Sequence, residues 1–155
     1  MRKKTDKEKE ILGQVEVILR RLKIDKNNAG YVPLLDAIAY AYAFPDEGLT
    51  EIIDMLSKEN YYLGLHVTHS EMDARAELYA KIVHTVKTAI EGGDGHYLRD
   101  LQLDSLMVIL HGKREKELEE LLLTEIGDKY SQYSNDEKIV LFFIKKILKA
   151  VKNPV

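Results

Sequence analysis

In this 155-residue chain, the residues best suited to chemistry by their type and spacing are the histidines His66 and His69, which Glu71 follows closely. Imidazole and carboxylate groups bind zinc, and two histidines three residues apart could reach one ion. The same residues belong to the segment Thr68-His69-Ser70-Glu71, a capping-box pattern that begins a helix. We therefore interpret the two histidines as exposed or capping residues, and we expect no metal site and no cofactor.

A second pair, Asp94 and His96, lies in a glycine-rich stretch that includes Gly92, Gly93 and Gly95. Such a pair could do acid–base work, but a general base needs a positioned partner and a pocket. The glycines also lack the Gly-Lys-Ser/Thr ending of a phosphate-binding loop. We interpret residues 92–96 as a linker, and as the best candidate for a hinge between two halves of the protein.

Acidic pairs one helical turn apart, Asp73 with Glu77 and Asp100 with Asp104, could bind magnesium. A chain with 26 acidic residues forms such pairs by chance on solvated helix faces, so we assign them no metal. The chain has no cysteine, which excludes disulfides, thiolate metal sites and thiol nucleophiles. No set of nucleophile, base and oxyanion donor can be assembled, so we expect a protein that is not an enzyme.

The charge is unevenly distributed along the chain, although the net charge is only -3. Residues 1–26 hold nine Lys/Arg against five Asp/Glu, residues 134–155 hold five against two, and the middle holds nine against nineteen. Basic ends could approach nucleic acid, or they could attract the acidic middle of the same molecule. We favour the second interpretation.

Hydrophobic periodicity predicts an all-α fold, a compact bundle of about seven helices. The expected helices cover residues 6–22, 34–44, 49–63, 68–90, 97–111, 113–126 and 139–151. The segment 34–44 is apolar on almost every side, which predicts a helix at the centre of the fold. A second capping box, Ser134 to Glu137, precedes the last helix. Short turns indicate one domain over residues 1–155.

Apolar residues within 68–90 follow a heptad spacing that suits packing on a neighbouring helix, either in the core or in a homodimer. They are Met72, Ala76, Tyr79, Val83, Val86 and Ile90. The nine tyrosines include the pairs Tyr40/Tyr42, Tyr61/Tyr62 and Tyr130/Tyr133. Such residues either line the core, with the hydroxyl reaching water, or form a partner-binding surface. We favour the core.

No stretch approaches the roughly twenty apolar residues that a membrane span needs. The charged start, Met1 to Glu10, is not followed by a signal-peptide core. We therefore expect a cytoplasmic protein without a membrane partner.

One segment, Gly30-Tyr31-Val32-Pro33-Leu34-Leu35-Asp36-Ala37-Ile38, follows an expected helix that ends at Leu22. It resembles the Gly-Tyr-x-x-Leu-x-x-Ala-Ile stretch of the C-terminal DNA-binding domain of the sporulation-initiation response regulator of Gram-positive spore formers. The resemblance implies a helix-turn-helix, with residues 49–62 as its first helix and the helix capped by Thr68 and Ser70 as its recognition helix. It also implies that Arg75, Lys81 and Lys87 approach DNA.

Two functional interpretations follow, and both are regulatory and non-catalytic. In the first, the protein is a helix-turn-helix transcription regulator that binds DNA. In the second, it is a helical protein-binding module of the immunity or inhibitor type, acting through its acidic middle and exposed tyrosines. The first requires basic groups gathered on one face, whereas the second requires a coherent acidic or aromatic patch.

Overall fold

The computed structural model describes residues 4–58, 71–110, 115–127 and 132–152. All regular structure in these ranges is helical, which confirms the all-α prediction. The helices are α1 (Asp6–Arg21), α2 (Tyr31–Ala43), α3 (Leu49–Ser57), α5 (Glu71–Gly92), α6 (Gly95–Asp100), α7 (Ser105–Leu110), α8 (Glu115–Ile126) and α9 (Asn135–Lys152). None of the helices within those ranges combines the length and apolar character that crossing a membrane demands.

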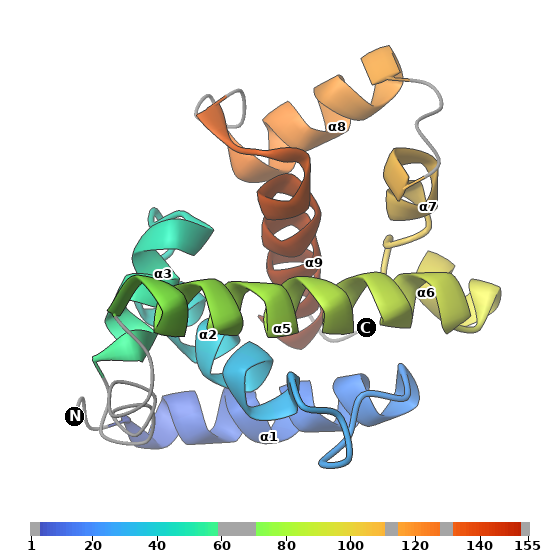
Figure 1. Cartoon of the computed structure of the whole chain (residues 1–155). Coiled ribbons are helices and arrows are strands. Elements are labelled where there is room, and N and C mark those ends of the chain that lie inside the picture. Colours follow the sequence, from blue (N-terminus) through green and yellow to red (C-terminus); the bar gives the residue numbers. More distant parts are fainter. Residues whose placement is uncertain (1–3, 59–70, 111–114, 128–131, 153–155) are drawn as a thin grey trace.

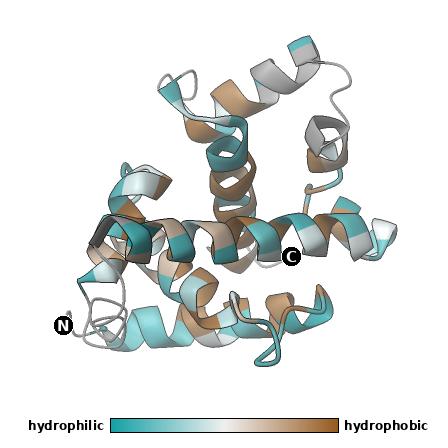
Figure 2. Ribbon diagram, in the orientation of Figure 1, coloured by the Kyte–Doolittle hydropathy of each residue, from teal (hydrophilic) through white to brown (hydrophobic). Residues whose placement is uncertain are grey.

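Helix α9 forms the centre of the fold. It packs against α1, α2, α3, α5 and α8, and in Figure 1 it passes behind α5 with α8 at the opposite end of the molecule from α1. Hydrophobic residues run along α9 in Figure 2, and Phe142, Phe143 and Ile147 are among its fully buried side chains. Helix α2 is also a core helix, as its apolar sequence predicts, because Leu34, Ala37 and Ile38 are inaccessible to solvent.

Side-chain caps fix the starts of the first and last helices. The Oγ atom of Thr5 accepts a hydrogen bond from the backbone N–H of Glu8 at 3.1 Å. The Oγ atom of Ser134 accepts one from the backbone N–H of Glu137 at 3.2 Å, which confirms a cap at this position. Since such a cap satisfies a donor that the helix itself leaves unpaired, α9 begins at Asn135, four residues before the expected start.

The prediction of one helix over residues 97–111 is wrong, because the chain forms two short helices there. Gln102 takes a left-handed conformation, with φ of 58°, between α6 and α7. The backbone N–H of Leu103 donates to the Leu98 carbonyl at 2.7 Å and closes α6. A left-handed residue commonly ends a helix, but it is usually glycine, so Gln102 gives no sequence signal. Helix α3 ends at Ser57. Residues 59–63, the expected continuation of this helix, and the expected cap at Thr68 lie outside the described ranges.

The predicted heptad seam on α5 is displaced from the face that the helix buries. Ala76 is exposed and Tyr79 is only half-buried, whereas Leu78 and Ile82 are almost completely buried. Leucine and isoleucine bring more apolar surface out of water than alanine does, so the helix turns that stripe inward. Val83, Val86 and Ile90 of the seam do face the core. A homodimer stays a prediction.

Gly30 and Gly13 differ in how closely neighbouring atoms pack around them. A Cβ atom at Gly30 would collide with the Thr85 hydroxyl and lie 2.5 Å from the Lys81 carbonyl oxygen, whereas nothing lies within 4 Å of one at Gly13. We expect Gly30→Ala to lower the free energy of unfolding by about 1–3 kcal/mol through overpacking of α2 against α5. Gly13→Ala should raise it by roughly 0.5–1 kcal/mol, because alanine is the better helix former. Urea denaturation followed by circular dichroism measures both, and equal midpoints for the two variants would contradict this packing.

Candidate functional site

The three basic residues predicted to approach DNA all lie on α5, and each forms an ion pair with a carboxylate of the same molecule. The pairs join Arg75 to Asp54 at 2.7 Å, Lys81 to Glu77 at 2.9 Å and Lys87 to Asp136 at 2.6 Å. Asp54 belongs to α3 and Asp136 to α9. Two of the three cations therefore hold helices together.

The spacing of these residues also separates them in space. They lie at intervals of six, and an α-helix turns by about 100° per residue, so successive side chains leave the axis about 240° apart. Arg75, Lys81 and Lys87 consequently point in three directions around α5, and they do not gather on one face.

The basic ends of the chain make similar internal contacts. Lys4 lies 3.7 Å from Asp36, and the Lys145 ammonium group donates to the backbone carbonyl of Pro45 at 3.1 Å. Both contacts join an end of the chain to its acidic middle. The Lys4–Asp36 ion pair is an attraction of the kind that the charge distribution predicts, whereas Lys145 meets a neutral backbone carbonyl.

The linker residues Asp94 and His96 serve the local backbone. The Asp94 carboxylate accepts a hydrogen bond from the backbone N–H of His96 at 2.9 Å and caps α6. Within the ranges that the structure covers, no three His, Asp or Glu side chains are grouped to hold a metal ion. His66 and His69 lie outside those ranges. The hinge proposed at residues 92–96 stays a prediction.

A concave surface extends over the turn between α2 and α3, along α3, and onto α5, α8 and α9. Its first part has a volume of about 420 Å³ and is lined by Pro45, Asp46, Glu47, Ile126, Tyr133, Leu141 and Lys145. The second, of about 430 Å³, shares Glu47 and adds Thr50, Glu51, Asp54, Met55 and Arg75. The third, of about 180 Å³, shares Thr50 and Arg75 and ends at Tyr79. We call these three contiguous parts the acidic hollow.

The amphipathic pattern of α3 creates the middle of the hollow. Leu49, Ile52 and Leu56 are inaccessible to solvent and fix one side of the helix in the core. Because an α-helix repeats every 3.6 residues, the other side presents Glu51 and Asp54 to the surface.

Tyr133 is held in place against the start of α3. A Cβ atom at Gly48 would lie 3.0 Å from the Tyr133 hydroxyl oxygen and 2.7 Å from a carboxylate oxygen of Glu51. A glycine at position 48 therefore lets the tyrosine ring approach the backbone at this point. Tyr133 therefore packs closely on the start of α3 at the edge of the hollow.

The hollow is lined by more carboxylates than cations, with Asp46, Glu47, Glu51 and Asp54 against Arg75 and Lys145. Asp46, Glu47 and Glu51 form no ion pair with any residue that the structure describes. Burial raises the pKa of Tyr133, and the neighbouring carboxylates of Glu51, Glu137 and Glu47 raise it further. Negative charges oppose ionisation of a phenol, so the raised pKa of Tyr133 reflects the carboxylates around its hydroxyl group.

Tyr79, at the other end of the hollow, lies near charged residues of α5 and α9. Burial raises its pKa first, a hydrogen bond with Ser134 opposes this, and the carboxylates of Asp136 and Glu137 raise the pKa again. The Tyr79 hydroxyl lies 3.2 Å from the Ser134 hydroxyl, which joins α5 to the cap of α9.

The tyrosines differ in burial, and a partner-binding surface formed by any of them stays a prediction. Tyr31, Tyr40 and Tyr97 are buried in the core, whereas Tyr79 and Tyr133 are half-buried at the hollow. The acidic residues of the hollow are absent from the sequence-based candidates, and the signal that could have found them is the local run of acidic residues from Asp46 to Asp54. The chain matches no known protein-family model, no curated protein and no solved structure.

Proposed function

We propose that this protein is a non-catalytic regulatory protein that binds a basic protein partner in its acidic hollow. The observation that carries the proposal is the group of three carboxylates, Asp46, Glu47 and Glu51, beside a cavity of about 420 Å³ with the apolar side chains of Ile126 and Leu141 in its wall. Lysine or arginine side chains of a partner would supply the opposite charges. Complementary charges of this kind speed association and select the partner.

The lining also favours a protein over a small cation. Tyrosine and methionine are enriched at protein interfaces, and here Tyr133 and Met55 line the hollow together with the carboxylates. Phe44, which is 40% exposed, comes directly before Pro45 at the edge of the hollow. A partner segment that mixes basic and apolar side chains would use both kinds of group.

A helix-turn-helix regulator that binds DNA is the second candidate function. Besides the family resemblance, it is favoured by exposed cations at and just after the end of α1. This segment contains four basic residues, Arg20, Arg21, Lys23 and Lys26, and one acidic residue, Asp25. Arg21 lies over the Tyr97 ring, 3.9 Å from its centroid. The internal ion pairs of Arg75, Lys81 and Lys87 favour the protein-binding function, since contacts to phosphate require these cations to be available.

Fluorescence anisotropy with a labelled peptide of alternating arginine and leucine tests the proposed function. We expect the double substitution Glu47→Gln/Glu51→Gln to weaken binding about five- to tenfold, because each exposed charge pair contributes up to about 1 kcal/mol. The matched control is Glu10→Gln/Glu91→Gln, which changes the net charge equally at exposed positions on α1 and α5. It should leave the affinity nearly unchanged.

Equal weakening by the two double variants would contradict the proposal, because it would mean that the peptide senses net charge alone. Absence of binding at low ionic strength would contradict it as well. A peptide of alternating glutamate and leucine, used in the same titration, should not bind.

A further inference from the structure

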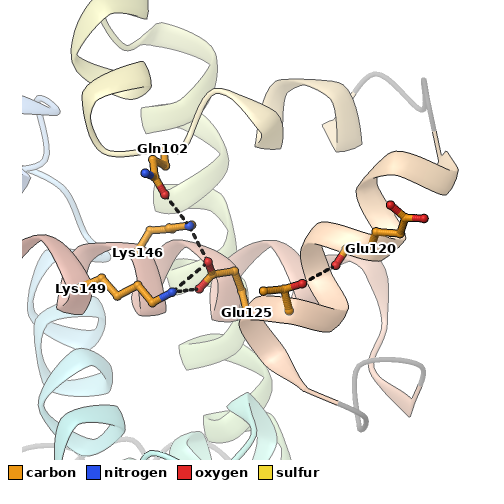
Figure 3. Close-up of polar contacts among 6 residues, drawn as sticks. Gln102, Glu120, Glu125, Lys146 and Lys149 are labelled. Atoms are coloured by element: carbon orange, nitrogen blue, oxygen red, sulfur yellow. Dashed lines mark hydrogen bonds and ion pairs between the residues drawn. The ribbon is translucent and has the colours of Figure 1, made fainter.

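Three charged side chains and a glutamine meet where α8 lies on α9. The ammonium group of Lys146 on α9 lies 2.5 Å from the Glu125 carboxylate on α8 and 2.8 Å from Oε1 of Gln102. Lys149, one turn farther along α9, lies 3.0 Å from the same carboxylate (Figure 3). The side chains of Lys146 and Glu125 are only 9% and 7% exposed. We call Glu125, Lys146 and Lys149 the ionic latch.

The latch joins α8 to α9, beside the apolar contacts that Leu122 and Ile126 of α8 make with the core. Helix α8 packs on α9 and on the short helix α7. Leu122 of α8 is buried, whereas Leu123 is 43% exposed. A buried ion pair that loses one partner leaves an uncompensated charge, so this attachment depends most on Lys146 and Glu125, whereas the Lys149 side chain is 58% exposed.

The latch and the acidic hollow use consecutive residues of the same two helices. On α8, Glu125 enters the latch while the next residue, Ile126, lines the hollow. On α9, Lys146 enters the latch while the preceding residue, Lys145, lines the hollow. A shift of α8 relative to α9 would therefore change the shape of the hollow.

We propose that Glu125, Lys146 and Lys149 position α8 as one wall of the acidic hollow, and that release of this latch opens the hollow. These three are positioning residues, and they set the shape of the site without lining it. The consequence for partner binding rests on the proposed function, whereas the positioning of α8 does not.

Hydrogen–deuterium exchange of the full chain, without any peptide, tests the latch directly. We expect Glu125→Gln to speed exchange of the α8 amides at least about tenfold, because local opening then costs less, while the α2 amides are unaffected. The matched control is Glu120→Gln, the same change on the same helix. The Glu120 side chain is exposed and points away from the latch in Figure 3. Lys149→Gln, which keeps the Lys146 contact, should give a smaller increase.

Equal exchange rates of the α8 amides in the Glu125→Gln and Glu120→Gln variants would overturn the proposal that the latch positions α8. Exchange that rises equally in α8 and α2 would overturn it too, because the pair would then support the whole domain rather than position one helix. Neither readout involves a partner, so the latch and the proposed function fail independently. If both hold, Glu125→Gln should also change the affinity for the arginine-leucine peptide, and Glu120→Gln should not.

Discussion

Replacement of Lys146 by methionine is expected to lower the free energy of unfolding by about 3 kcal/mol. The substitution leaves the Glu125 carboxylate, which is 7% exposed, without its closest cation, and breaking a buried pair typically costs about 3–5 kcal/mol. Lys149 still contacts the carboxylate at 3.0 Å, which keeps the loss at the lower end of that range. Urea denaturation of the two proteins at neutral pH measures the difference.

The double variant Lys146→Met/Glu125→Met is the control, because it removes both charges and should recover most of the lost stability. The pH dependence gives a second readout. Burial tends to raise the pKa of Glu125, but hydrogen bonds from Lys146 and Lys149 outweigh it and lower the pKa from its ordinary value of 4.5.

A lowered folded-state pKa means that the carboxylate stabilises the protein fully above pH 4.5 and that this contribution is lost as the pH falls through the folded-state value. The loss of stability on acidification should be smaller in the Lys146→Met variant than in the original protein. A double variant that is less stable than Lys146→Met would contradict this account of the pair.

Phe143→Ala is expected to lower the free energy of unfolding by about 3–5 kcal/mol, a large fraction of the roughly 5–15 kcal/mol that stabilises an ordinary domain. Phe143 is inaccessible to solvent on α9, the helix against which five others pack. Its removal leaves a cavity that the neighbouring helices fill only in part. Thermal denaturation by calorimetry measures the loss.

Phe44→Ala is the matched control for this prediction. The Phe44 side chain is 40% exposed and stacks on Tyr40 with 6.1 Å between ring centroids, so its removal should lower stability by only about 1–1.5 kcal/mol. Similar losses at the two positions would mean that α9 is not the centre of the core.

The sequence predicts the helices well where apolar residues repeat with helical spacing and where polar caps begin them. It fails at Gln102, because a left-handed glutamine looks like any other helical residue in the sequence. The sequence also gives no signal that Lys146 is buried beside a carboxylate. A lysine in a Lys-Lys pair suggests a surface position, and only the fold brings the helix with Glu125 beside it.

The candidate site also has features that follow from the sequence and features that only the fold reveals. That Arg75, Lys81 and Lys87 point in different directions follows from their spacing alone, since six residues correspond to about 240° around a helix. Their ion pairs with Asp54 and Asp136 join separate helices and do not follow from spacing. The acidic hollow is assembled from the turn before α3, from α3 itself, and from α5, α8 and α9, so no single segment of the sequence contains it.

The most direct test of the central claim is a nuclear magnetic resonance titration of the ¹⁵N-labelled protein. The arginine-leucine peptide and a mixed-sequence DNA duplex are added separately at the same ionic strength, and the shifted amide signals are mapped onto the chain. Binding in the acidic hollow predicts that the peptide shifts signals of residues 46–54 and 133–137, and that DNA shifts none of them. Shifts caused by DNA at Arg75, Lys81 and Lys87, with no response to the peptide, would contradict the claim and favour the DNA-binding regulator.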